Sequence, residues 1–295
     1  MDEEPWNSRK ARATAWFAEL RDQICSSFEA LEDRQTTGPF ASLPPGRFVQ
    51  SQTKRQGLVG EESGGGRMSA MRDGRLFEKV GVNYSEVFGR LSAAALGSMK
   101  ARKNLSADPR FWASGISVVA HLRSPKVPAV HMNTRMFWTP SSAWFGGGAD
   151  LNPMVEMPAD TEFFHNELRV ACDLHAADYY SRFKKWADEY FLIRHRNESR
   201  GVGGIFFDDL ETSDWESDFA FTQDVGRAFL RAYLPIVQKR MTESWTDAER
   251  DWQLVKRGRY AEFNLVYDRG TMFGLQSGHN VDAVLMSLPP LAKWT

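Results

Sequence analysis

Two histidines, an asparagine and an arginine lie close together in the segment HLRSPKVPAVHMNTR, residues 121–135. Imidazole can accept or donate a proton near neutral pH, and a guanidinium offers two parallel donors to one carboxylate. These residue types suit a ligand that carries carboxylates and takes part in proton transfer. The prolines in the middle of the segment favour a turn at residues 124–128 between two extended runs.

Alternation along the second of these runs places its histidine, asparagine and arginine on one face of a sheet. If the hairpin folds about Lys126, His121 lies opposite His131. Ser117 then lies opposite Arg135, and a shift of register by two positions changes the partners but not the face. The same alternation is common on the solvated face of an antiparallel sheet, so the pattern alone leaves a binding site and a solvated face equally open.

A metal site is another chemistry that the two histidines allow. Structural or catalytic zinc needs three or four ligands that converge at about 2 Å, and pairing of these two strands supplies at most two imidazoles. The other ligands would have to come from distant segments. The motif by itself therefore favours anion binding and proton transfer over a metal.

Three further segments carry acidic residues beside glycine or at the end of an extended run. In WFGGGADLNP, glycines would let backbone amides approach a ligand, and Asp150 either accepts from an N–H donor or caps a glycine-rich turn. In YDRGTMFGL, Asp268 is either a base at a strand end or the start of a turn. Asp208 and Asp209 are neighbours on a predicted strand and face opposite sides, so we do not expect them to share a proton.

Composition and charge exclude several classes of protein. The chain has 295 residues, 42% of them hydrophobic, which is enough for a substantial core. Its 37 basic and 38 acidic residues give a net charge of -1, so no overall field favours nucleic acid or an anionic membrane. Two cysteines without metal or redox spacing indicate a reducing compartment. An acidic start and the lack of an apolar run of about 18 residues predict a cytoplasmic protein without a transmembrane segment.

The elements that must position these residues are strands and helices in irregular order. Helical spacing of apolar residues predicts an N-terminal amphipathic helix within residues 1–35, followed by a linker at 36–46. The pair Asp73-Gly74 between two extended runs predicts a hairpin. The glycines at 64–66 lack the Gly-Lys-Ser/Thr ending of a phosphate-binding loop, so we expect a strand entry there.

The second half of the chain is expected to be mostly helical. A capping box of Thr246 and Glu249 should open one of the helices. We expect a strand in GVGGIFFDDL and one or two strands in RYAEFNLVYDRGTMFGL. Without regular alternation of strands and helices, this order predicts a single α+β domain over residues 1–295 with a mostly antiparallel sheet. The helices are expected at about 160–175, 177–191, 218–240 and 246–257.

Six blocks of the sequence together resemble the oxygen-dependent coproporphyrinogen III oxidases of haem biosynthesis. The blocks cover roughly residues 45–295, and each is long and idiosyncratic enough that chance agreement in all six is negligible. In chain order they are GGGRMSAMRDGRLFEKVGVNYSEVFG, VHMNTR, WFGGGADLNP, KKWADEYFLIRHRNESRGVGGIFFDDL, RGRYAEFNLVYDRGTMFGL and VLMSLPPLAKW.

The resemblance implies an enzyme that oxidatively decarboxylates coproporphyrinogen III to protoporphyrinogen IX. Two of the four propionates become vinyl groups, with consumption of O2 and release of CO2 and hydrogen peroxide. No flavin, nicotinamide or haem is implied, because the electron-rich ring supplies the reducing electrons to O2 itself. The resemblance also implies helices on both faces of a broad antiparallel sheet and a homodimer formed through the C-terminal half.

Carried over residue by residue, the resemblance also implies a site. His131 matches the proton donor, and Asp268 with Arg269 matches a catalytic pair in which the aspartate removes a pyrrole proton. Asp150 matches the acid that meets the pyrrole N–H groups, and Arg135 would hold a propionate. The expected substrate contacts are Ser117, Asn133, Thr134, Arg135, Asp150, Gly278, His279 and Asn280.

Some members of the family have been assigned a metal, and this chain departs from the family pattern in two places. Because a histidine-rich site for an anion works without a metal, we do not expect a divalent metal to be required. Where bacterial members read Gly-Gly-Arg, this chain has Gly-His-Asn at 278–280, so an arginine contact is missing or replaced by His279. The segment MFWTPSSAWFGGG is also shorter than its counterpart in many relatives. The histidines that match residues sometimes assigned to a metal in bacterial members are His121, His131, His165 and His195.

Two other classes of protein stay open at this point. A tetrapyrrole carrier could keep the pocket and lose the reaction, although binding alone would not require both Asp268 and Arg269. A histidine-based metallohydrolase would hold a stoichiometric metal and lose activity with a chelator.

Overall fold

A seven-stranded antiparallel sheet is the centre of the structure, a computed structural model that describes residues 3–56, 62–100, 103, 105–276 and 280–294. The spatial order of the strands is β1-β2-β3-β4-β5-β6-β9, and every neighbouring pair is antiparallel. The predicted α+β class with an antiparallel sheet is confirmed. The strands are β1 (Val49–Gln56), β2 (Glu62–Arg72), β3 (Phe77–Arg90), β4 (Arg110–Leu122), β5 (Ala129–Thr139), β6 (Ser142–Asn152) and β9 (Gly203–Leu210), and a separate small ladder joins β7 (Leu192–Ile193) to β8 (Glu198–Ser199).

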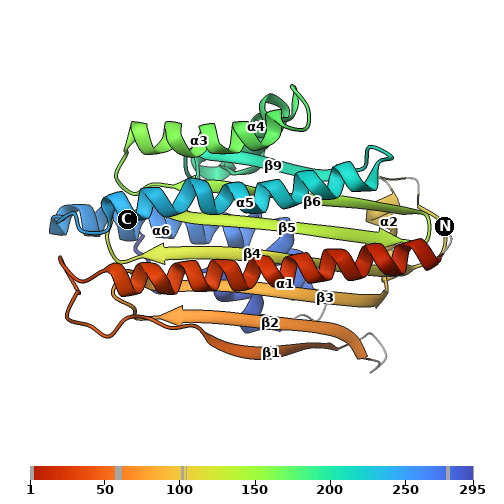
Figure 1. The fold of residues 1–295 in the computed structure, drawn as a ribbon, viewed down its shortest axis with the longest axis horizontal. Helices are drawn as coiled ribbons and strands as arrows, with labels where there is room; N and C mark the ends of the chain where they lie inside the picture. The colour runs from red at the N-terminus through yellow and green to blue at the C-terminus, as the bar shows by residue number, and fades with distance from the viewer. Residues whose placement is uncertain (1–2, 57–61, 101–102, 104, 277–279, 295) are drawn as a thin grey trace.

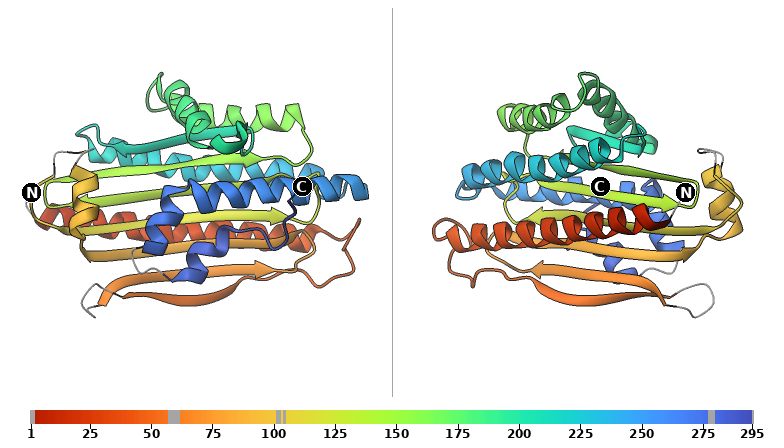
Figure 2. Two further views of the ribbon diagram at one scale, coloured as in Figure 1. Left: turned by 180° about the vertical axis from the view of Figure 1, so that it is seen from behind. Right: turned by 45° about the vertical axis from the view of Figure 1, so that its right-hand side comes forward.

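Helices cover both faces of this sheet, as expected (Figure 1). α1 (Glu3–Arg34) and α5 (Trp215–Arg240) lie across one face, while α3 (Pro158–Asp173) and α4 (Tyr179–Tyr190) lie beside β9. Figure 2 shows the opposite face, which carries the C-terminal helices. These are α6 (Asp247–Val266), α7 (Arg269–Gln276) and α8 (Val281–Val284), and the remaining short helices are α2 (Ala93–Lys100), η1 (Arg194–Arg196) and η2 (Leu285–Ser287).

The two faces of β5 differ in chemistry, as its alternation predicts. Met132 and Met136 are fully buried in the apolar core beneath α1 and α5. His131, Asn133 and Arg135 are partly exposed on the other face, toward the C-terminal helices. We call that side of the sheet the polar face.

The register of the hairpin between β4 and β5 differs by two positions from the expected one. Ser117 pairs with Asn133, and Val119 pairs with His131, so the turn is centred on Pro125. The reason lies in the turn, where the Val127 N–H donates to the Ser124 carbonyl. Proline then occupies the second position of a four-residue turn, which its fixed φ favours. The polar side chains stay on one face despite the shift.

The predicted strands in RYAEFNLVYDRGTMFGL are wrong, because this segment is helical. The capping box of Thr246 and Glu249 opens α6 as expected, but the helix continues to Val266. Tyr260 and Phe263 are buried against the sheet at helical spacing, so tertiary packing decides the structure of an aromatic-rich segment that also suits a strand. Asp268 consequently lies between two helices and not at a strand end.

The carboxylate of Glu32 anchors α1 to the hairpin between β2 and β3, which turns at Asp73-Gly74 as predicted. Glu32 is fully buried and accepts hydrogen bonds from the backbone N–H groups of Gly46 and of 75–77 at 2.7–2.9 Å. A side chain on Gly74 would collide with this carboxylate. Glycine at that position therefore allows the close approach of the turn to the helix.

Replacing Glu32 by alanine is expected to lower the free energy of unfolding by about 3 kcal/mol, because four backbone donors, three of them buried, lose a charged acceptor. Urea unfolding followed by circular dichroism measures this change. Glu19→Ala, at an exposed position of the same helix, is the matched control and should change the free energy by less than about 0.5 kcal/mol. Equal effects of the two substitutions would contradict the anchoring role.

Candidate active site

An ion pair between Asp150 and Arg200 lies at the centre of the polar face. Asp150 is on β6 and Arg200 precedes β9, and their side chains are 1% and 2% exposed. Nη2 of Arg200 donates to both carboxylate oxygens at 2.7 and 2.8 Å. Burial by itself would raise the pKa of the Asp150 carboxyl, but the Arg200 guanidinium and a hydrogen bond from His131 lower it to about 2. The carboxylate is therefore ionised at neutral pH.

Aromatic rings fix the position of the Arg200 guanidinium. Its Cζ lies 4.4 Å from the ring centroid of Phe191 and 4.6 Å from those of Tyr260 and Phe263. Nη1 also donates to the amide oxygen of Asn264 on α6 at 2.9 Å. Cation–π contacts and a buried hydrogen bond together keep this charge in one place beneath α6.

His131 connects the buried ion pair to the partly exposed part of the polar face. It is the direct cross-strand partner of Asp150, and its Nδ1 lies 2.8 Å from Asp150 Oδ1. Its Nε2 lies 3.2 Å from the amide nitrogen of Asn133. Because that amide nitrogen is a donor, Nε2 accepts and Nδ1 carries the proton that it donates to the carboxylate. Asp150 would therefore stabilise His131 if Nε2 gained a proton.

Two arginines from distant parts of the chain meet at one carboxylate on the same face. Nη2 of Arg135 donates to Oδ1 of Asp208 at 2.9 Å, and Nη2 of Arg269 lies 3.7 Å from Oδ2. Nη1 of Arg135 also points to Asn133 Oδ1 at 3.5 Å. Both arginines are expected in the site from the family resemblance, whereas Asp208 is not.

Asp268 directly precedes α7 and accepts a hydrogen bond from a partly buried tyrosine. Its Oδ2 accepts from the backbone N–H of Thr271 at 2.7 Å, and its Oδ1 accepts from the Tyr190 hydroxyl at 2.9 Å. Burial and then the neighbouring Asp268 charge raise the pKa of Tyr190 to about 12, so this hydroxyl stays protonated. The ring of Tyr190 stacks on Phe206 at 4.2 Å and lies under the Arg269 guanidinium at 5.2 Å.

Of the other residues expected to contact the substrate, some lie on the polar face and some do not. Ser117 lies on β4 directly opposite the asparagine of β5, on the polar face. The side chain of Thr134 is fully buried on the opposite face, so only its backbone borders the polar face. Asn280 caps α8 by accepting from the Ala283 N–H. Gly278 and His279 lie outside the described residues.

The four histidines considered as metal ligands do not converge. Among the residues that the structure describes, no group of three or more histidine, cysteine, aspartate or glutamate side chains could hold a metal ion. Burial lowers the pKa of His121 to about 3, and this ring is therefore neutral. Each ring is bonded to different protein groups: His121 to the Ser287 carbonyl, His131 to Asp150 and Asn133, His165 to Tyr180 and the Val202 carbonyl, and His195 to Glu262 and Tyr267. These residues do not fit a shared metal ion.

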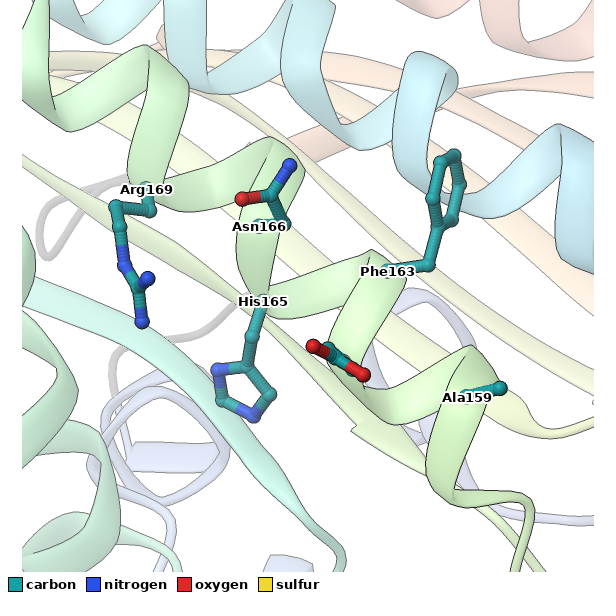
Figure 3. Close-up of a pocket in the computed structure, with 6 residues that line it drawn as sticks. Ala159, Phe163, His165, Asn166 and Arg169 are labelled. Atoms are coloured by element: carbon teal, nitrogen blue, oxygen red, sulfur yellow. The ribbon is translucent and has the colours of Figure 1, made fainter.

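A pocket of about 520 Å³ along α3 contains one of these histidines (Figure 3). None of the residues around it is among the side chains of the polar face described above. We therefore place the candidate site on the polar face and not at this pocket. Its lining residues are Ala159, Glu162, Phe163, His165, Asn166 and Arg169.

The sequence blocks that supply these contacts match one known family. The sequence model for coproporphyrinogen III oxidase matches residues 12–295. The chain belongs to the coproporphyrinogen III oxidase family. The polar face is thus formed by strands and helices that all lie within the matched region.

Named bacterial members of the coproporphyrinogen III oxidase family are similar over nearly their whole length. The oxygen-dependent coproporphyrinogen-III oxidase of Rickettsia bellii (strain RML369-C) is 49% identical over 281 residues, which are 95% of this chain and 96% of the relative. That of Rickettsia africae (strain ESF-5) is 48% identical over 287 residues, 97% of this chain and 98% of the relative. Among the described residues of this family member, no helix combines the length and the apolar content needed to cross a membrane.

Stability should fall in acid as Asp150 is protonated. Its pKa is about 2 in the folded protein and about 4 in an unfolded chain, so the ion pair contributes fully above about pH 4. The contribution of about 2 kcal/mol is lost as the pH falls from 4 toward 2. Urea unfolding at pH 5 and pH 3 should therefore show a smaller difference between the wild type and Asp150→Asn at pH 3. A difference that does not change with pH would contradict the assignment.

Proposed function

We propose that this protein catalyses the oxygen-dependent oxidative decarboxylation of coproporphyrinogen III to protoporphyrinogen IX in haem biosynthesis. The observation that carries the proposal is a row of charged and polar side chains on the polar face. Asp150 pairs with Arg200 and with His131, Asp208 pairs with Arg135 and Arg269, and Asn133 lies between His131 and Arg135. A tetrapyrrole with four propionates and four pyrrole N–H groups needs cations at its rim and a carboxylate at its centre. Family membership over residues 12–295 supports the same substrate.

The overall reaction at each propionate balances without a cofactor. The propionate side chain, one O2 and one proton give a vinyl group, CO2 and hydrogen peroxide. Two electrons pass from the substrate to O2, and the β-carbon loses a hydrogen while the carboxylate leaves. The reduced tetrapyrrole is the electron donor, so we infer that no flavin, haem or metal is required.

The side chains of the polar face take separate roles in this reaction. Asp268 removes a pyrrole proton, and the electron-rich ring reacts with O2 to give a ring peroxide. The peroxide takes a proton from the β-carbon and leaves, and loss of CO2 forms the vinyl group and returns electrons to the pyrrole nitrogen, which Asp268 reprotonates. The one proton consumed overall completes the hydrogen peroxide, and His131 supplies it while Asp150 stabilises the imidazolium. Arg135 binds a propionate.

Contacts to the periphery of the substrate come from the edges of this row. Ser117 and Asn133 are cross-strand partners and offer polar groups beside Arg135. The backbone of Thr134 is expected to contribute in the same place. In the segment Gly278-His279-Asn280, we expect His279 to make the substrate contact that the arginine of Gly-Gly-Arg makes in bacterial members. Substitution of His279 by alanine would test this contact through the KM for the substrate.

We further propose that the protein is a cytoplasmic homodimer associating through its C-terminal half. Among the residues that the structure describes, fifteen large apolar side chains are exposed, and nine of them lie between Trp252 and Trp294, on α6, α7, α8 and the tail. Such a concentration on one part of a surface is typical of an interface. The cysteines Cys25 and Cys172 are free and buried, which agrees with a reducing compartment. Sedimentation equilibrium would distinguish a dimer from a monomer.

The proposed activity is tested by supplying purified protein with coproporphyrinogen III in air and following product by porphyrin fluorescence after oxidation. We expect conversion to the divinyl product with the same rate in the presence of a metal chelator. A chelator-sensitive rate with a stoichiometric bound metal would favour a metalloenzyme, and binding of substrate without turnover would favour a tetrapyrrole carrier.

A further inference from the structure

Alternation along β9 places Asp208 on the polar face, and a β-bulge in β9 holds its carboxylate there. Between the paired residues at either end of the irregularity, Gly146 of β6 faces both Asp208 and Asp209 of β9. Asp209 has a φ of 56°, and its backbone N–H donates to Asp208 Oδ1 at 3.1 Å. Gly204 and Phe206 pair with Asp150 and Gly148 on the polar face, so Asp208 shares that face, and the bulge that follows directs the Asp209 N–H to its carboxylate. The result is a carboxylate turned toward the arginine of β5.

The Asp208 carboxylate is buried, whereas the two guanidinium groups that contact it are accessible. The Asp208 side chain is 7% exposed, and those of Arg135 and Arg269 are 36% and 46% exposed. The arginines come from β5 and from the start of α7, which are far apart in the sequence. The carboxylate therefore holds two cations from different elements side by side while leaving donors of both open to a ligand.

Glycines on both neighbouring strands make room for this arrangement. Arg135 pairs with Gly115 on β4 and with Gly146 on β6. A methyl group on Gly146 would come within 2.8 Å of Asp208 Oδ1 and within 2.9 Å of Arg135 Nη2. A methyl group on Gly115 would come within 2.8 Å of Arg135 Cβ. The positions beside Arg135 on β4 and β6 thus carry no side chain, which leaves room for the arginine and its carboxylate.

We propose that Asp208 is a positioning residue that holds Arg135 and Arg269 as a pair and limits their joint charge to that of one propionate. Two guanidinium groups and one carboxylate have a net charge of +1, which matches a single bound carboxylate. Without Asp208 the two cations would repel each other and attract the substrate anion more strongly. The proposal rests on the proposed function, since it takes the ligand to be a propionate of the substrate.

Steady-state kinetics of Asp208→Asn with coproporphyrinogen III test this role. We expect kcat to fall by roughly 10- to 100-fold, because the arginines lose their fixed positions. KM should stay the same or fall, and its increase with salt should be steeper than in the wild type, because the site has gained a positive charge. A merely structural role would not change the salt dependence of KM.

Gly146→Ala provides a second variant that disturbs position without changing charge. It should also lower kcat, and the salt dependence of its KM should match that of the wild type. Glu211→Gln is the control, because it removes an ion pair with Lys103 at the same end of β9. This variant should show wild-type kinetics.

Three results would overturn the assignment of Asp208: an unchanged kcat in Asp208→Asn, an unchanged kcat in Gly146→Ala, or a KM in Asp208→Asn that rises with wild-type salt dependence. If Asp208→Asn does not fold, Gly146→Ala decides through its kcat alone. An inactive wild-type protein would instead contradict the proposed function, so the two failures are distinguishable in the same assay.

Discussion

Replacing Asp150 by asparagine is expected to lower turnover by at least roughly 100-fold and the free energy of unfolding by about 3–5 kcal/mol. Arg200 is 2% exposed, so the substitution leaves its charge buried without a counter-ion. His131 also loses the carboxylate that would stabilise its imidazolium. Measurements of kcat in air and of urea unfolding at pH 7 give the two quantities separately.

Asp160→Asn separates a loss of stability from a loss of chemistry. Asp160 is another buried carboxylate, paired with Arg240 and Lys239 at the junction of α3 and α5. Its substitution should destabilise the protein and leave kcat close to the wild-type value. The double substitution Asp150→Leu with Arg200→Met should recover part of the stability but no turnover, because no unpaired charge is then buried. Wild-type kcat in Asp150→Asn would contradict the role of Asp150.

Asp268→Asn is expected to lower turnover by roughly 10²- to 10⁴-fold while substrate binding stays measurable. Asparagine caps a helix about as well as aspartate, and its oxygen can still accept from Tyr190 or from Thr271. The substitution thus removes the base and retains the shape of the site. Binding of coproporphyrinogen III under anaerobic conditions and turnover in air are the two measurements.

Tyr190→Phe is the matched control for this prediction. It removes the hydroxyl that donates to Asp268 and keeps the ring that stacks on Phe206 and lies under Arg269. We expect it to retain most of the turnover, since the carboxylate remains. Equal losses in Tyr190→Phe and Asp268→Asn would mean that the arrangement of the hydrogen bonds, and not the base, limits the reaction.

The sequence predicts much of the fold because its local signals agree with the tertiary packing. The amphipathic N-terminal helix, the hairpin at Asp73-Gly74 and the capping box at Thr246 each depend on neighbouring residues, and all three are confirmed. The end of α6 is decided by burial against the sheet, so local composition misleads there. That one domain spans the whole chain stays a prediction.

The candidate site is predictable in its residue types and only partly in its contacts. Alternation identifies the face that carries His131 and Arg135, and the short turn at 140–141 could have placed Asp150 opposite His131. Two helices separate Arg200 from Asp150 in the sequence, and nothing in the spacing of the residues indicates that the two side chains form an ion pair. Alternation along β9 also puts Asp208 on this face, but its pairing with Arg135 and Arg269 joins segments far apart in the sequence and has no local signal.

The transfer of electrons from substrate to O2 is the central claim, and oxygen-controlled turnover tests it most directly. Purified protein is mixed with coproporphyrinogen III under argon, and air is then admitted while CO2, hydrogen peroxide and product are measured. We expect no product under argon and, after air is admitted, one CO2 and one hydrogen peroxide for each O2 consumed. Formation of the divinyl product under argon at the rate seen in air would contradict the proposed function.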